Sequence, residues 1–133
     1  MLILASKGTN TIKVDRSVTA KTVGSGSLDV LATPVMIASM ENAAQTSVAS
    51  QLEPGYGTVG VLMNVRHLAP TPIGGCVTAE SELIEIDGRR LVFRVTASDG
   101  HEIVGDGVHE RVVIDEAKFL EKAQRKAEER GRA

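Results

Sequence analysis

Glu41 is a lone carboxylate in a long, uncharged stretch of the chain. Residues 34–52 contain no other charged side chain, and Ile37, Ala44 and Val48 share the face of Glu41 at helical spacing. An acidic group in apolar surroundings costs free energy unless it is paired or used. The carboxylate could serve as a general base or as a nucleophile. The alternatives are a structural pair with an arginine and a position facing solvent.

Two more side chains could take part in the same chemistry. His67 ends a β-like stretch in which alternate residues are apolar: Val59, Val61, Met63 and Val65. This pattern places His67 at the rim of the core, where it could orient Glu41 or move a proton, although most such histidines are structural. Thr33 precedes Pro34, an order typical of a helix N-cap and first turn. A hydroxyl there would also lie beside free backbone N–H groups that can stabilise an oxyanion.

The elements that position these groups follow from periodicity and turn residues. A helix is predicted over 33–52, ended by 53–55. Extended segments are expected before it, with a flexible Gly-Ser loop between, and four antiparallel strands and a last helix after it. The extended segments are predicted over 11–14 and 17–23, and the Gly-Ser loop over 24–27. The four strands are predicted over 58–68, 76–86, 89–97 and 102–114. Asp87-Gly88 predicts a tight hairpin.

The last helix begins at Asp115 as N-cap, with Phe119, Leu120, Ala123 and Ala127 as an inner stripe. The facing of strand 102–114 is ambiguous, because its apolar residues share a face with Asp106 and Glu110. The chain is expected to fray over residues 126–133. The order of elements predicts an α+β domain over residues 1–133, with one sheet wrapped around one helix. The edge strands need cover, and continuing the sheet into a second subunit is a common solution.

Composition narrows the function further. The chain has 133 residues, of which 42% are hydrophobic and 2% aromatic, with a net charge of −2. No basic surface for nucleic acid or membranes is expected. One cysteine and three scattered histidines make a metal site unexpected. Without a signal peptide or membrane-length apolar run, a cytoplasmic protein is predicted.

Several motifs resemble the hotdog-fold acyl-CoA thioesterases, and specifically their fluoroacetyl-CoA thioesterase branch. They span roughly residues 30 to 120 in the same order: ATPVMIASMENA, LEPGYGTVG, VRHLAPTPIG, EIDGRRLVFRVTASDG and GVHERVVID. The resemblance implies a thioesterase in which a Thr, a Glu and a His act on the thioester while a Gly and an Arg assist. By position these are Thr33, Glu41, His67, Gly60 and Arg111. It implies no cofactor besides the CoA of the substrate.

One departure from the branch concerns substrate choice. The fluoroacetate-specific enzyme has phenylalanines in a lid segment before the helix, where this chain has Gly24-Ser25-Gly26-Ser27 and no aromatic. A general short- or medium-chain acyl-CoA is therefore expected. The alternative is a non-catalytic acyl-CoA binding or sensing module, which would keep Arg111 but would not need Glu41. The missing helix histidine argues against the hydratases and dehydratases of this fold.

The positions of Thr33 and Glu41 also predict how the site is assembled. Eight residues of straight helix separate them by about 12 Å, so one thioester carbonyl would not easily touch both. We therefore expect a homodimer whose active sites form between subunits; whether dimers pair further is left open. Arg111 has a competing interpretation as a surface group, and Arg89, Arg90 and the basic last helix are alternative phosphate contacts. A bulge is the structural alternative for Gly60.

Overall fold

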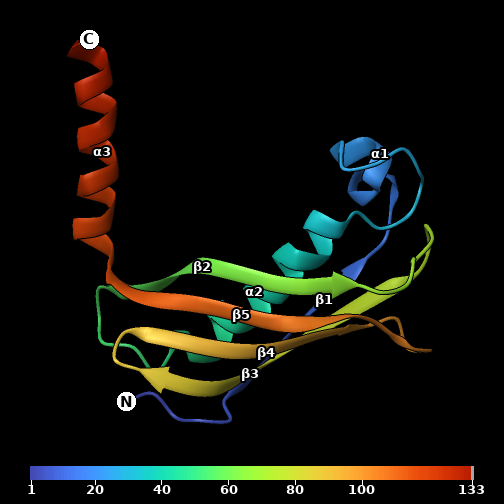
Figure 1. The fold of residues 1–133 in the computed structure, drawn as a ribbon, viewed down its shortest axis with the longest axis horizontal. Coiled ribbons are helices and arrows are strands. Elements are labelled where there is room, and N and C mark those ends of the chain that lie inside the picture. Colours follow the sequence, from blue (N-terminus) through green and yellow to red (C-terminus); the bar gives the residue numbers. More distant parts are fainter. Residues whose placement is uncertain (133) are drawn as a thin grey trace.

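The computed structural model describes residues 1–132 as one antiparallel sheet with a helix along one face (Figure 1). The strands lie in the order β1-β3-β4-β5-β2, so β1 and β2 are the edges. This confirms the predicted α+β arrangement. The elements are β1 (Lys7–Lys13), a 3-10 turn (Arg16–Val18), α1 (Ala20–Val23), α2 (Thr33–Ala49), β2 (Tyr56–His67), β3 (Cys76–Asp87), β4 (Arg90–Ser98), β5 (Ile103–Asp115) and α3 (Glu116–Arg132).

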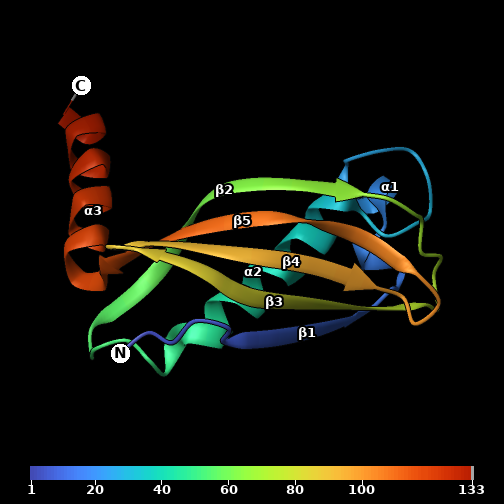
Figure 2. The same cartoon turned by 60° about the horizontal axis from the view of Figure 1, so that its bottom comes forward.

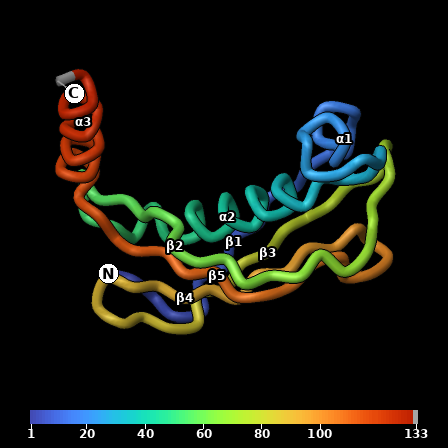
Figure 3. The backbone as a smooth tube through the Cα atoms, turned by 45° about the horizontal axis from the view of Figure 1, so that its top comes forward, coloured from blue at the N-terminus to red at the C-terminus, as the bar shows by residue number. Residues whose placement is uncertain are grey.

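The central helix α2 lies across the inner face of the curled sheet (Figures 2 and 3). The side chains of Met36, Met40 and Val48 of α2 are fully buried. They belong to one core with Phe93 and Val95 of β4. Burying a side chain of this size contributes about 1.5–3 kcal/mol. With so few aromatics available, methionines and small aliphatic residues fill the space between helix and sheet. The helix ends at Ala49, earlier than the predicted Leu52.

The edge strand β2 is interrupted by a shift in register. It pairs with β5, and the register shifts between Gly60 and Leu62. A bulge adds one residue and so resets which side chains face inward. Met63 and Val65 pack on the core as predicted, whereas Gly60 rather than Val59 faces α2, and Val61 is 55% exposed. The predicted inward row was therefore wrong in its first half.

The inner face of β5 is partly polar. His109 and Arg111 are buried, and Val113 packs on the core, so this row faces α2. The opposite row, with Asp106 and Glu110, faces outward, except that Val104 is fully buried beside the register shift between Ala97 and Ser98. This settles the ambiguity of the strand. The predicted tight hairpin joins β3 and β4, but Asp87 still pairs with Arg90, so its two turn residues are Gly88 and Arg89, one position later than predicted.

The N-terminal segment differs from the expectation. Residues 17–23 are not extended, because two capping side chains favour short helical turns. Asp15 accepts a hydrogen bond from the Ser17 N–H, and Thr19 accepts one from the Thr22 N–H. Gly24 then ends α1 in the left-handed conformation, with φ of 93°.

The last helix begins where predicted but packs differently. The Asp115 carboxylate accepts a hydrogen bond from the Lys118 N–H as N-cap. The helix then projects from the end of β5, away from the sheet (Figure 1). Phe119 and Leu120 are 44% and 67% exposed, so the predicted inner stripe is not covered within the chain. The helix continues to Arg132, and the last residue of the tail predicted to fray lies outside the described residues.

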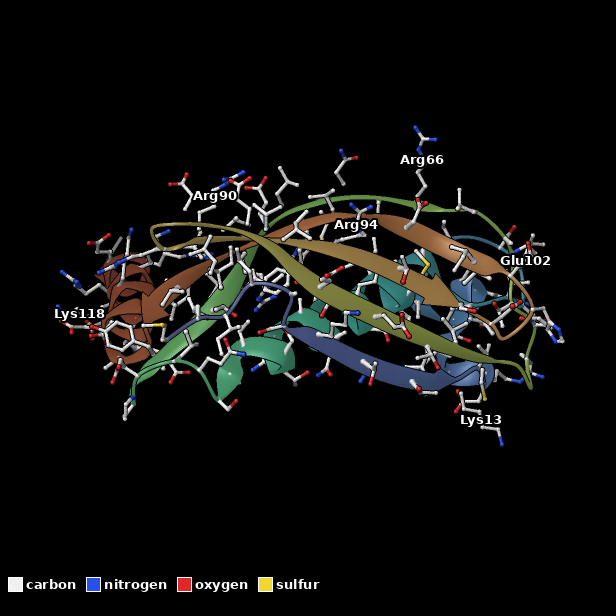
Figure 4. The ribbon with its side chains drawn as sticks, turned by 90° about the horizontal axis from the view of Figure 1, so that it is seen from below. Lys13, Arg66, Arg90, Arg94, Glu102 and Lys118 are labelled. Carbon is white, nitrogen blue, oxygen red and sulfur yellow. The ribbon has the colours of Figure 1, made fainter. Side chains whose placement is uncertain are left out.

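The outer face of the sheet is charged. Arg66, Arg90 and Arg94 project from the side opposite α2 (Figure 4). Arg90 is held by Glu85 and Glu110 at 2.8 and 2.7 Å. Within residues 1–132, no helix is both long enough and apolar enough to cross a bilayer.

Candidate active site

Thr33 and His67 meet where α2 begins and β2 ends. The Thr33 Oγ1 lies 2.7 Å from the His67 Nδ1, a normal hydrogen-bond distance. The N-cap of α2 is Ala32, which makes no side-chain cap bond, and the proline lies in the first turn. The prediction that Thr33 caps the helix was therefore wrong. Its hydroxyl instead forms a hydrogen bond with His67 at the end of β2.

The second nitrogen of His67 is enclosed by the protein. Its Nε2 is buried and has no hydrogen-bond partner of normal geometry among the described residues. Burial lowers the pKa of His67, and the Ala69 backbone partly offsets this. A neutral imidazole offers one donor and one acceptor. Nδ1 therefore pairs with the threonine hydroxyl, while Nε2 is enclosed near the Ala69 backbone.

A surface pocket of about 290 Å³ opens beside this pair. Its walls come from α1, the loop after it, the start of α2 and the segment after β2. Small and apolar side chains predominate in its lining: Ala20, Ser25, Val30, Leu31, Leu68, Ala69 and Pro70. A short acyl chain would fit such a lining, because burying its methylenes is favourable.

Glu41 lies further along α2 and faces the bulge of β2. Its Oε2 is 3.7 Å from the Arg111 Nη1, and its side chain is 41% exposed while that of Arg111 is 8% exposed. A Cβ added to Gly60 would lie 2.8 Å from the same Oε2. A close approach at Gly60 and the register shift beside it are thus both present. Glu41 is paired with a cation and still open to a ligand.

Arg111 is a buried residue, in contrast to the surface interpretation. Its Nε donates to the Thr58 Oγ1 at 2.7 Å, and its Nη2 donates to the Thr58 carbonyl at 2.8 Å. Burial lowers the pKa of Arg111, and the Glu41 carboxylate opposes this. A guanidinium remains charged at neutral pH. It therefore supplies a fixed positive charge beside the carboxylate.

His109 lies beside Arg111 as well, although nothing in its local sequence singles it out. It is fully buried, and its Nε2 lies 3.1 Å from the Arg111 Nη1. Residues two apart on a strand share a face, so a buried Arg111 also implies a buried His109. His101, by contrast, is exposed.

The five predicted residues thus form two groups. Thr33 lies with His67, and Glu41 lies with Gly60 and Arg111. Within the part of the chain that the structure describes, no hydrogen bond or ion pair joins the groups. For both groups to act on one thioester, they would have to lie within reach of the same carbonyl.

A second pocket of the molecule is lined by none of the five predicted site residues. A pocket of about 330 Å³ lies over β1, β3 and β4, where Lys7, Glu80, Glu82 and Arg94 alternate in charge. Residues 1–132 contain no group of three acidic, histidine or cysteine side chains that could hold a metal ion. Cys76 is free and exposed.

The curled sheet around a single helix places the chain in a known structural class. It superimposes on a hot-dog-like protein from Thermanaerovibrio acidaminovorans with a TM-score of 0.83 at 25% identity, covering 92% of this chain and 91% of that one. The class is therefore the hotdog fold, as the resemblance implied.

Comparison of sequences defines the family within this class. Residues 14–117 match the family model of the fluoroacetyl-CoA-specific thioesterases. The fluoroacetyl-CoA thioesterase of Streptantibioticus cattleyicolor is 45% identical over 98 residues, which are 74% of this chain and 70% of the relative. A mutant of the fluoroacetyl-CoA thioesterase, in complex with acetyl-CoA, gives a TM-score of 0.88 at 36% identity over 94% of this chain and 98% of that one. The chain belongs to the fluoroacetyl-CoA-specific thioesterase family, and it is a thioester hydrolase.

Proposed function

We propose that this chain hydrolyses short- or medium-chain acyl-CoA to the free acid and CoA, with Glu41 as base or nucleophile, assisted by Thr33 and His67. The observation that carries the proposal is the position of Glu41. Its carboxylate is held 3.7 Å from a buried guanidinium, yet 41% of its side chain is exposed. A charged base that a ligand can still reach is what thioester hydrolysis requires.

Two routes are open to that carboxylate. As a base, Glu41 takes a proton from water while the water oxygen attacks the carbonyl carbon; the C–S bond then breaks and the CoA thiolate takes up a proton. As a nucleophile, Glu41 attacks the carbonyl carbon itself, which releases the thiolate and leaves a mixed anhydride for water to open. In both routes a donor must stabilise the oxyanion. The Thr33 hydroxyl and the Thr33 backbone N–H suit this role, because Pro34 has no N–H and the N–H groups of Val35 and Met36 donate to the Ala32 carbonyl.

The site is proposed to form between two subunits. The free edge of β2 can pair with β2 of a second copy, which protects both edges. In an antiparallel pairing about a two-fold axis, the end of one strand lies beside the earlier part of the other. An axis near Met63 and Asn64 would bring His67 of one copy toward Gly60 of the other. Both residues face the helix side, so the two groups would share one cavity.

The substrate class rests on the pocket beside Thr33. The loop that follows α1 contributes Ser25 to the lining where an aromatic would narrow it. Acetyl-CoA is the ligand in one structurally similar family member. Acyl groups from acetyl to medium length are therefore the proposed substrates of this chain.

A panel of acyl-CoAs with thiol detection tests the proposal, using wild type and the isosteric E41Q. We expect turnover of short or medium chains by wild type and a loss of at least about 100-fold in kcat for E41Q. Binding of CoA by E41Q should persist. Wild type without turnover on any member of the panel would contradict the enzyme assignment, and equal kcat in E41Q would contradict the role of Glu41.

A further inference from the structure

His109 is a fully buried imidazole beside the proposed base. It projects from β5 on the same face as Arg111, and its ring lies 6.2 Å from that of Phe93, centroid to centroid, tilted by 31°. A Cβ at Gly60 would lie 3.2 Å from its Cε1. The ring edge therefore lies directly beneath the bulge of β2.

Both nitrogens of this ring have partners, and the partners determine its tautomer. Nδ1 lies 2.8 Å from the Leu62 carbonyl oxygen, which can only accept, so Nδ1 carries the hydrogen. In a neutral ring Nε2 is then an acceptor. Its neighbour at 3.1 Å is the Arg111 Nη1, which can only donate. The two contacts are thus mutually consistent for one tautomer of the neutral ring.

The environment favours that neutral state. Burial lowers the pKa of His109, the Leu62 carbonyl opposes this, the Arg111 charge lowers it further, and the Glu41 charge raises it. A protonated ring would direct an N–H at the Nη1 of Arg111. Two donors and two positive charges would then face each other.

The contact fixes the end of Arg111 that faces Glu41. Thr58 holds the Nε and Nη2 side of the guanidinium, and His109 holds Nη1. One hydrogen of Nη1 points to His109. The Glu41 Oε2 lies 3.7 Å from the same nitrogen, an ion-pair distance. Without an acceptor at Nε2, only Thr58 and the Glu41 charge would hold the guanidinium. Its Nη1 could then shift toward Gly60, where nothing but a hydrogen occupies the side-chain position.

We propose that His109 is a positioning residue for hydrolysis, which holds Arg111 through the Nε2 lone pair and so places the Glu41 carboxylate. Because it acts on Glu41, this role rests on the proposed function. A purely structural role, as a core ring between Phe93 and β2, makes different predictions. It would depend on packing and on the Leu62 bond, and not on an acceptor facing Arg111.

Two substitutions separate these roles, since asparagine and glutamine reproduce different halves of the ring. In H109N the amide N–H can replace Nδ1–H toward Leu62, but no acceptor reaches Arg111. In H109Q the amide oxygen can replace Nε2 toward Arg111, at the loss of the Leu62 bond. We expect kcat to fall about 10- to 100-fold in H109N with KM within about threefold, and to stay within about threefold of wild type in H109Q. The exposed His101 offers the matched control, H101N, with unchanged kinetics.

The E41Q background distinguishes the two proposals. If E41Q loses turnover and H109N adds no further loss to it, His109 acts through Glu41. If E41Q loses turnover while H109N and H109Q have equal kcat, the positioning role is wrong and the role of Glu41 stands. If E41Q keeps turnover, the proposed function of Glu41 fails first.

A measurement on wild type keeps the proposal testable should a variant fail to fold. Nitrogen-15 NMR of the imidazoles should show His109 as a neutral ring with hydrogen on Nδ1 at pH 7. A ring with hydrogen on Nε2, or one protonated at both nitrogens, would overturn the proposal.

Discussion

Gly60 and Glu41 are in such close contact that residue 60 cannot carry a side chain without moving the carboxylate. A Cβ there would lie 2.8 Å from the Glu41 Oε2 and 3.4 Å from the Arg111 Nη1. The backbone conformation of Gly60 is not left-handed, since it is absent from the glycines of positive φ. The requirement for glycine therefore comes from the space that the site needs.

The substitution G60A should reduce activity far more than stability. The Glu41 carboxylate is the end of a flexible side chain, so it can yield at small cost to the fold. A displacement of about 1 Å can nevertheless cost about 100-fold in rate. We expect kcat to fall about 10- to 100-fold, with the melting temperature lowered by only a few degrees. Steady-state kinetics and thermal melts check this.

The control for G60A is G57A in the same strand. The three atoms nearest to a Cβ at Gly57 all belong to the Glu116 side chain, the first at 3.0 Å, and none to Glu41 or Arg111. G57A should keep the wild-type kcat. A fall of the same size in both variants would mean that the strand, and not the contact with Glu41, is sensitive.

The sequence contains enough local information to predict α2 and Glu41. The helix follows from its apolar pattern and its proline and glycine boundaries, and the lone charge marks the site within it. Thr33 shows the limit of this approach. A threonine before a proline satisfies the local rule for a cap, but the bond that its hydroxyl makes is to His67, 34 residues away. A local sequence rule takes no account of a hydrogen-bond partner that only the tertiary fold brings close.

The strands show a second limit. Apolar alternation assigns the inner face of a strand only when the inner residues are apolar. On β5 the inner row holds the polar residues His109 and Arg111, both buried. The register shift after Gly60 resets the alternation of β2 in the same region. The hydrophobic pattern therefore does not predict which residues face inward where polar side chains interrupt the core.

The pH dependence of stability should follow the buried His109 and the half-buried His67. Burial lowers the pKa of both His67 and His109 in the folded state. The unfolded chain then binds protons below about pH 6.5, near the ordinary pKa of histidine, while the folded chain does not. Stability from this source is complete above that pH and falls as the pH decreases. We expect the melting temperature to drop between pH 6.5 and 5.

Thermal melts of wild type and the double variant H67Q/H109Q across pH 5 to 7.5 measure this effect. The variant should be less stable at neutral pH but should show a flatter pH dependence. Parallel curves for the two proteins would assign the acid destabilisation to other groups. Asp15 and Glu110, whose pKa values are lowered by hydrogen bonds to Ser17 and Arg90 respectively, would contribute only at lower pH.

The chain-length preference should respond to the loop between α1 and α2. Ser25 lines the pocket beside Thr33. An aromatic ring in its place would occupy the volume that the outer methylenes of an acyl chain need. We expect S25F to lower kcat/KM for hexanoyl-CoA at least about 10-fold relative to acetyl-CoA. The control is S27F, because Ser27 lies in the same loop but does not line the pocket, and its ratio should equal that of wild type.

Mixed dimers test whether the two groups of site residues come from different subunits. E41A removes the carboxylate of one group of site residues, and H67A removes the imidazole of the other, so each protein alone should be inactive. If sites form between subunits, a hybrid dimer has one doubly altered site and one intact site. Random pairing of equal amounts makes about half of the dimers hybrid, which should restore about a quarter of the wild-type activity.

Coexpression of the two variants with different tags, followed by tandem purification, isolates the hybrid. The matched control pairs E41A with the double variant E41A/H67A, a combination in which no intact site can form. Recovery in the first pair and none in the second would place Glu41 and His67 on opposite subunits, because no other arrangement yields an intact site from these parts. A hybrid as inactive as its parents would locate the whole site within one chain, and α2 would then have to bend to bring Thr33 and Glu41 to one carbonyl.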